Sequence, residues 1–227
     1  MTRRLRRGVT AIAAVTALLA LASGTIAQSP ARAGPIEASV VDDKGKPIED
    51  AVVSLVPAAG ATPVGPATTA VMDQVDKEFV PHVLAVPVGA AVRFPNRDNI
   101  KHHVYSFSPP KKFELPLYSG SPASPVIFDK PGVIVLGCNI HDWMVAYVYV
   151  AETPYFAKSA ADGRARIADV PAGAWEARVW HPRMRIAPEK TTRAVTLPGA
   201  DQLAWTLSLK RDWKPGRGPG RYGGVEN

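Results

Sequence analysis

Hydrophobic residues along the chain occur in short runs rich in β-branched and aromatic residues, interrupted about every ten residues by Gly, Pro or Asp. After residue 34 no stretch keeps a 3.6-residue apolar period through three helical turns. This pattern predicts an all-β chain of one or two sandwiches. The expected strands are Ile36–Val41, Ala51–Leu55, Val83–Val86, Ala91–Phe94, Val104–Phe107, Val126–Phe128, Val133–Leu136, Val145–Val150, Ala165–Ile167, Trp175–Trp180, Arg193–Leu197 and Leu203–Leu209.

Two segments lack such a run. Residues 57–69 consist of Pro, Ala, Gly and Thr around a single valine and carry no charge, which indicates a linker. Residues 211–227 are rich in Gly, Pro and Arg, and we expect them to form a disordered basic tail.

The N-terminus has the pattern of an export signal. Arginines at Arg3–Arg7 precede an apolar run, Val9–Leu21, that is too short and too rich in alanine for a bilayer span of about 20 residues. Small residues at Ala31–Ala33, or alternatively at Thr25–Ala27, offer a cleavage site. We therefore expect residues 1–33 to be a cleavable signal peptide of a periplasmic protein, with a retained anchor as the alternative. The arginine-rich start of this segment is compatible with export by either the Sec or the Tat route.

Most of the net charge lies in that leader. The 227 residues include 27 Lys and Arg against 20 Asp and Glu, a formal charge of +7, which alone would suggest a nucleic-acid partner. Residues 1–33 hold five arginines and no acid, so the remaining chain has a net charge of only +2. We expect no nucleic-acid partner and, without a later apolar span, no stable membrane span.

Cys138 is the single cysteine of the chain, so it cannot form an intramolecular disulfide. Its neighbours in Gly137–Met144 offer a thiolate, an imidazole and a thioether at C-x2-H-x2-M spacing. These are the ligand types of a blue-copper electron-transfer site, which needs one more histidine. His102 and His103, about 36 residues upstream, are the candidates. A zinc site normally has four strong ligands, often with more than one cysteine, so zinc is disfavoured. A buried, chemically inert cysteine with no metal is the remaining alternative.

Residues 70–151 resemble a cupredoxin. The ligand loop has the C-x2-H-x2-M spacing of amicyanin, and Val92–His102 resembles the strand, turn and histidine of that protein. Phe128–Gly132, which leads into the strand before the cysteine, is also typical of cupredoxins. The longer string 72–149 resembles periplasmic proteins of the plastocyanin-like, methylamine-utilisation type.

The resemblance implies one type 1 copper ion. His102, Cys138 and His141 would be its equatorial ligands and Met144 its axial ligand. Where most cupredoxins have asparagine after the first histidine, this chain has His103. Neighbouring residues of a strand point to opposite faces, so only one of the two histidines can enter the site. We favour His102 and keep His103 as the alternative.

A second sandwich is expected around the first. Residues 35–58 and 155–210 resemble the two parts of a carboxypeptidase regulatory-like, transthyretin-like sandwich, which normally follow one another closely. About a hundred residues separate them here, so the cupredoxin would be inserted into a loop of the small sandwich. Consecutive independent domains are the alternative.

The function implied by the resemblance is one-electron transfer without catalysis. Partners would be periplasmic redox proteins such as c-type cytochromes or a dehydrogenase. The alternative is a periplasmic copper-binding, buffering or tolerance protein that does not relay electrons, because the ligand sequence alone does not separate the two.

Overall fold

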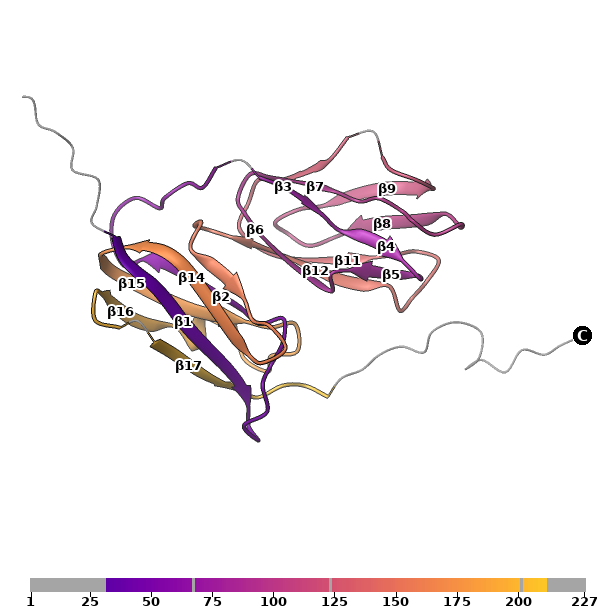
Figure 1. Cartoon of the computed structure of the whole chain (residues 1–227). Coiled ribbons are helices and arrows are strands. Elements are labelled where there is room, and N and C mark those ends of the chain that lie inside the picture. The colour runs from indigo at the N-terminus through magenta and orange to yellow at the C-terminus, as the bar shows by residue number, and fades with distance from the viewer. Residues whose placement is uncertain (1–31, 67, 123, 201, 212–227) are drawn as a thin grey trace, which may run out of the picture.

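The computed structural model describes residues 32–66, 68–122, 124–200 and 202–211 (Figure 1). The predicted signal peptide therefore lies outside the described residues except for Arg32 and Ala33, and the predicted tail except for Arg211. Within the described part the only helix is the short 3-10 turn η1 (Pro188–Thr191), and strands make up the rest of the regular structure. The all-β prediction is confirmed. No described helix is long and apolar enough to cross a bilayer.

Strands β3 to β12 form what we call the central sandwich. Its two main sheets have the strand orders β10-β7-β3 and β6-β12-β11-β8-β9, and β4 and β5 form a separate hairpin. The large side chains between the sheets are fully buried, among them Phe94, Phe128, Ile134 and Leu136. The bounds are β3 (Thr69–Val71), β4 (Asp73–Val75), β5 (Glu78–Val80), β6 (Val83–Pro87), β7 (Ala90–Arg93), β8 (His102–Ser106), β9 (Phe113–Tyr118), β10 (Val126–Phe128), β11 (Gly132–Gly137) and β12 (Val145–Ala151).

The remaining strands form the flanking sandwich, with sheet orders β14-β1-β17 and β13-β2-β15-β16. Strand β1 pairs with β14 and β17, and β2 pairs with β13 and β15. Strands from the start and from the end of the chain thus share both sheets, although β3 to β12 lie between them in sequence. The bounds are β1 (Arg32–Asp42), β2 (Val52–Pro57), β13 (Phe156–Lys158), β14 (Arg164–Pro171), β15 (Gly173–Trp180), β16 (Arg193–Leu197) and β17 (Gln202–Leu207).

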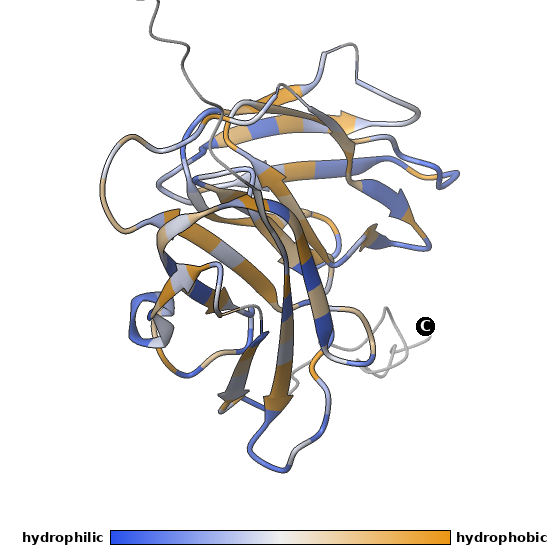
Figure 2. Ribbon diagram, turned by 60° about the vertical axis from the view of Figure 1, so that its left-hand side comes forward, coloured by the Kyte–Doolittle hydropathy of each residue, from blue (hydrophilic) through white to orange (hydrophobic). Residues whose placement is uncertain are grey.

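Alternating hydropathy explains which face each strand buries (Figure 2). In β17 exposed and buried residues alternate strictly, as in a strand with one face in a core and the other in water. Strand β12 differs because both of its faces are covered. Ala146 and Val148 point into the core of the central sandwich, whereas Tyr147 and Tyr149 pack against the core of the flanking sandwich. One strand therefore contributes to both cores.

An aromatic cluster joins the two sandwiches. The ring of Trp180, at the end of β15, lies 5.8 Å from that of Tyr147 and 5.5 Å from that of Tyr149, measured between centroids. The hydroxyl of Tyr149 also lies 3.0 Å from Ser54 Oγ in β2. Because β12 directly follows the ligand loop, this packing fixes one end of that loop against a second folded body.

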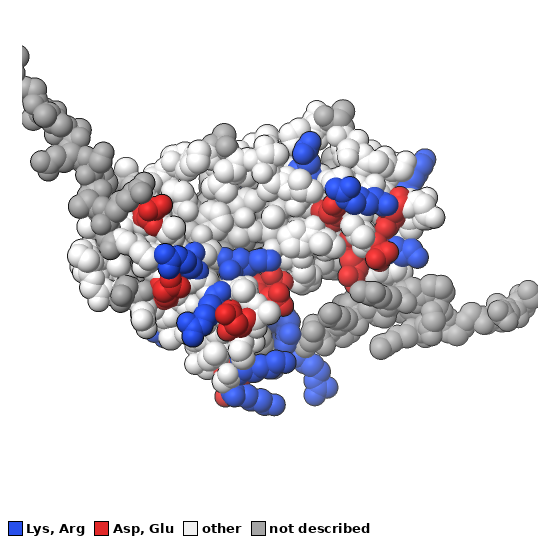
Figure 3. All heavy atoms as spheres, viewed as in Figure 1, with Lys and Arg blue, Asp and Glu red and all other residues white. Residues whose placement is uncertain are grey.

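Several strands were not predicted. β4 and β5 have three residues each, too few to show a period of two. β9 alternates in burial only over its first four residues and contains Pro116, which is tolerated because β9 is at the edge of its sheet. Charged side chains do not gather by sign, and acidic and basic residues lie interspersed on the face shown in Figure 3.

Candidate metal centre

Three strand ends bring the predicted ligands together. His102 is the first residue of β8, Cys138 directly follows β11, and His141 and Met144 belong to the turn that leads into β12. Strands β8, β11 and β12 are neighbours in one sheet. The positions of the ligands therefore depend on the register of that sheet, in which Gly137 pairs with both Tyr105 and Val145.

His102, Cys138 and His141 form a compact group. Their donor atoms all lie within 4.8 Å of one another. Cys138 Sγ is 4.0 Å from His102 Nδ1 and 3.8 Å from His141 Nδ1, so both imidazoles present the same ring nitrogen to the sulfur. His102 is fully buried and Cys138 is 4% exposed, whereas His141 is only partly buried. Water thus reaches the group mainly past His141.

This spacing fits a metal ion held by one sulfur and two nitrogens. A metal ion with bonds of about 2.0 Å to nitrogen and about 2.3 Å to sulfur, at trigonal angles, would place the sulfur about 3.7 Å from each nitrogen. The distances of 3.8 and 4.0 Å are close to that value. A soft thiolate with two imidazoles suits copper, and the trigonal arrangement of two histidines and one cysteine is that of blue-copper sites.

His103 lies outside the group. As expected for consecutive strand residues, its side chain leaves the opposite face from that of His102. Its Nε2 is 2.8 Å from Glu114 Oε1 on β9, and its ring lies 5.6 Å from that of Tyr105. The Nδ1 of His103 is buried without a hydrogen-bond partner among the described residues. The hydrogen bond and the ring contact of His103 are thus made with β9 and β8.

The ligand loop is a tight turn. The amide of Met144 donates to the carbonyl of His141 at 2.9 Å, and Met144 itself is 1% exposed in the core of the central sandwich. Gly137, which precedes Cys138, lies close under the ring of Tyr105. A Cβ atom at this position would lie 2.7 Å from Cζ of Tyr105, whose ring covers the strand.

A residue that sequence reasoning did not single out, Asp98, supports the buried histidine. Its Oδ2 lies 2.7 Å from His102 Nε2, on the side of the ring away from Cys138. Burial would raise the pKa of Asp98, but the hydrogen bonds from His102 and from the amides of Lys77 and Asp76 outweigh it, and the pKa is lower than usual. Asp98 stands four residues before His102, in the turn that leads into β8. This spacing is the sequence feature that could have identified it as a partner of His102.

The other ligand histidine is also perturbed. Burial lowers the pKa of His141, and the neighbouring His102 and Lys77 lower it further. The ring of Trp143 lies 5.1 Å from that of His141, and its Nε1 donates to the carbonyl of Lys77 at 3.1 Å. The neutral imidazole is the form that binds a metal, so this environment favours ligation.

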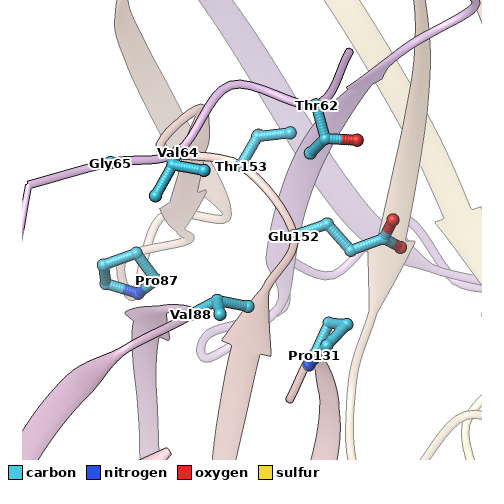
Figure 4. A pocket seen from close by; sticks show the side chains of 8 residues that line it. All are labelled: Thr62, Val64, Gly65, Pro87, Val88, Pro131, Glu152 and Thr153. Atoms are coloured by element: carbon cyan, nitrogen blue, oxygen red, sulfur yellow. The ribbon is translucent and has the colours of Figure 1, made fainter. Parts of the chain in front are cut away.

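Two hollows lie near the junction of the sandwiches. One of about 240 Å³ is lined by Val64, Pro87 and Glu152, and none of the candidate ligands reaches it (Figure 4). The other, of about 780 Å³, is lined by Trp143 and Met144 of the ligand loop and by residues of the flanking sandwich. His82 and His181, for which no ligand role was predicted, line this second hollow.

Comparisons with known proteins give partial matches. No protein-family model and no curated protein matches the chain. Among solved structures, a purple cupredoxin from Nitrosopumilus maritimus is 28% identical, with a TM-score of 0.30, over 33% of this chain and 83% of the other. A copper-containing nitrite reductase from Thermus scotoductus is 26% identical, with a TM-score of 0.33, over 50% of this chain and 28% of the other.

A mutant of amicyanin in the Cu(I) state is 20% identical, with a TM-score of 0.32, over 45% of this chain and 99% of the other. At TM-scores this low, the functional conclusion depends on the ligand geometry of the chain itself.

Proposed function

We propose that this protein is a type 1 copper protein of the cupredoxin kind that carries single electrons between redox partners. The observation that supports this most strongly is the convergence of two imidazole Nδ1 atoms on one buried cysteine sulfur at 3.8 and 4.0 Å. His102, Cys138 and His141 would hold one copper ion, with Met144 as the axial ligand. Copper bound there would supply a one-electron Cu(II)/Cu(I) couple.

The residues of the chain would keep the site rigid and mostly dry. His102 and Met144 are almost completely buried, and the ligand loop is fixed by its own turn and by β12. A site that cannot rearrange would hold its ligands alike in both oxidation states. The partly exposed His141, beside Ile140 that is 48% exposed, would be the point where electrons enter and leave.

The location and partners belong to the same proposal. A leader of residues 1–33 would export the protein to the periplasm, where c-type cytochromes or a dehydrogenase would exchange electrons with it. The flanking sandwich would be one transthyretin-like domain split by the central sandwich. Its packing against Tyr147 and Tyr149 of β12 suits a scaffold or a docking module.

Repeated redox cycling separates an electron carrier from a copper buffer. The Cu(II)-loaded protein would be reduced with ascorbate and reoxidised with ferricyanide, in the presence of a Cu(I) chelator. We expect full one-electron reversibility with copper retained in wild type and in His103→Ala, and loss of copper in His102→Ala. Transfer of copper from the reduced wild-type protein to the chelator in the first cycle would favour buffering and contradict electron relay.

A further inference from the structure

The carboxylate of Asp98 forms a hydrogen bond with the buried imidazole of the His102, Cys138 and His141 group, at 2.7 Å from His102 Nε2. Building on the proposed function, we propose that Asp98 is a positioning residue that fixes the tautomer and orientation of His102 and thereby lowers the reduction potential of the copper centre. It would act through the imidazole, without touching the metal.

The geometry assigns the proton of the imidazole. For His102 Nδ1 to serve as a ligand beside Cys138 Sγ, that nitrogen must be unprotonated. The remaining proton then lies on Nε2, which donates to Asp98 Oδ2 across 2.7 Å. The side chain of His102 is fully buried and that of Asp98 is 13% exposed, so water does not compete effectively for this bond.

The turn between β4 and β5 holds Asp98 in place. The amide of Asp76 donates to Oδ1 at 2.7 Å and the amide of Lys77 donates to Oδ2 at 2.9 Å. Both turn residues have positive φ angles, 52° and 60°, as in a type I′ hairpin turn, and both of their amides bond to this carboxylate. Each carboxylate oxygen thus has a backbone donor, and the carboxylate cannot rotate without losing one of them.

The same turn also contacts the second ligand arm. The carbonyl of Lys77 accepts a hydrogen bond from Trp143 Nε1, and the ring of Trp143 lies 5.1 Å from that of His141. The β4-β5 hairpin therefore contacts both histidine arms, one through Asp98 and one through Trp143. This hairpin of two three-residue strands belongs to neither main sheet.

A carboxylate bonded to a metal-bound imidazole makes that imidazole more electron-donating. The added negative charge favours Cu(II) over Cu(I), because the higher positive charge interacts more strongly with it in a site of low dielectric constant. Loss of the negative charge should weaken Cu(II) binding more than Cu(I) binding, and the reduction potential should rise.

Asp98→Asn removes the charge and keeps the shape, and Glu114→Gln provides the matched control. Glu114 bonds to His103 Nε2 in the same way, at 2.8 Å, but its side chain is 67% exposed and His103 lies outside the ligand group. We expect Asp98→Asn to reduce Cu(II) affinity 10- to 100-fold. Each tenfold loss specific to Cu(II) corresponds to a potential about 59 mV more positive. Glu114→Gln should leave both quantities near wild type.

The experiment combines competition against a Cu(II) chelator, a potentiometric titration and 15N NMR of the histidine rings in the metal-free protein. In metal-free wild type, His102 should be a single Nε2–H tautomer, and in Asp98→Asn a mixture. Asp98→Glu keeps the charge and should restore part of the wild-type potential. The proposal is overturned if Asp98→Asn and Glu114→Gln shift the potential equally, or if the His102 tautomer is unchanged in Asp98→Asn.

The two proposals fail in different ways. If wild type forms no copper–thiolate centre, the proposed function fails, while the tautomer of His102 in the metal-free protein still decides whether Asp98 positions the ring. If the centre forms and its reduction potential is the same in Asp98→Asn as in wild type, the proposed function stands and the role of Asp98 is refuted. Should Asp98→Asn not fold, Asp98→Glu and the metal-free NMR of wild type decide the question.

Discussion

Replacing His181 with asparagine is expected to remove about 2 kcal/mol of the stability that the protein loses between pH 7 and pH 5. His181 follows β15 and is 7% exposed. Burial, together with the charge of Arg183, lowers the pKa of His181 to about 4. Its Nδ1 accepts a hydrogen bond from the backbone amide of Arg183 at 3.2 Å, an interaction that only the neutral ring can make at that atom.

The size of the effect follows from linkage. In the unfolded chain the pKa of a histidine is about 6.5, so acid protonates the unfolded state first and stability falls as the pH drops from about 6.5 to about 4. One pKa unit corresponds to about 1.4 kcal/mol. The difference between the unfolded and folded pKa values therefore limits the contribution of His181 to stability to about 3 kcal/mol. About 2 kcal/mol of this should be lost between pH 7 and pH 5. Above pH 7 the contribution is fully present.

Urea unfolding of the metal-free protein at pH 7, 6 and 5 measures this effect. In His181→Asn the side-chain oxygen can still accept the amide of Arg183 but does not titrate, so the variant should lose about 2 kcal/mol less than wild type over this range. His82→Asn, a substitution of an exposed histidine in the same hollow, should retain the wild-type dependence. Equal losses in wild type and His181→Asn would refute the reasoning.

Two further predictions concern the flanking sandwich, one at its junction with the central sandwich and one inside it. Trp180→Ala removes the ring that packs on Tyr147 and Tyr149 and should lower the free energy of unfolding by about 3–5 kcal/mol in urea titrations; a loss below about 1 kcal/mol would show that the two bodies do not stabilise each other. Ser159→Ala leaves the buried amide of Ala51 without its Oγ acceptor at 2.9 Å and should cost about 1–3 kcal/mol. A thermal unfolding midpoint equal to that of wild type would contradict this second expectation.

The fold class could be predicted because it depends on local patterns. Period-two alternation, as in β17, and turn residues between runs identify strands one at a time. The pairing of the strands depends on contacts between distant residues, such as Val40 in β1 with Trp205 in β17. Local patterns contain no signal for such pairs. The β4-β5 hairpin escaped prediction because its turn, Asp76 and Lys77, lacks the glycine that normally marks positive φ angles.

The candidate site could be predicted only in part, for a related reason. Residues close in sequence, such as Cys138 and His141, reveal their chemistry by their spacing. The choice between His102 and His103 could not be derived from spacing, since alternation says only that the two point to opposite faces. Asp98 was missed because its backbone donors, in the β4-β5 turn, lie more than twenty residues away in sequence.

The most direct test of a copper–thiolate centre is the visible spectrum of the protein during titration with Cu(II). The wild-type protein should develop an intense thiolate-to-copper charge-transfer band that saturates at one copper per chain, because Cys138 is the one thiol available. The band should be absent in Cys138→Ser. A wild-type protein that stays colourless, or a band that persists in Cys138→Ser, would contradict the account.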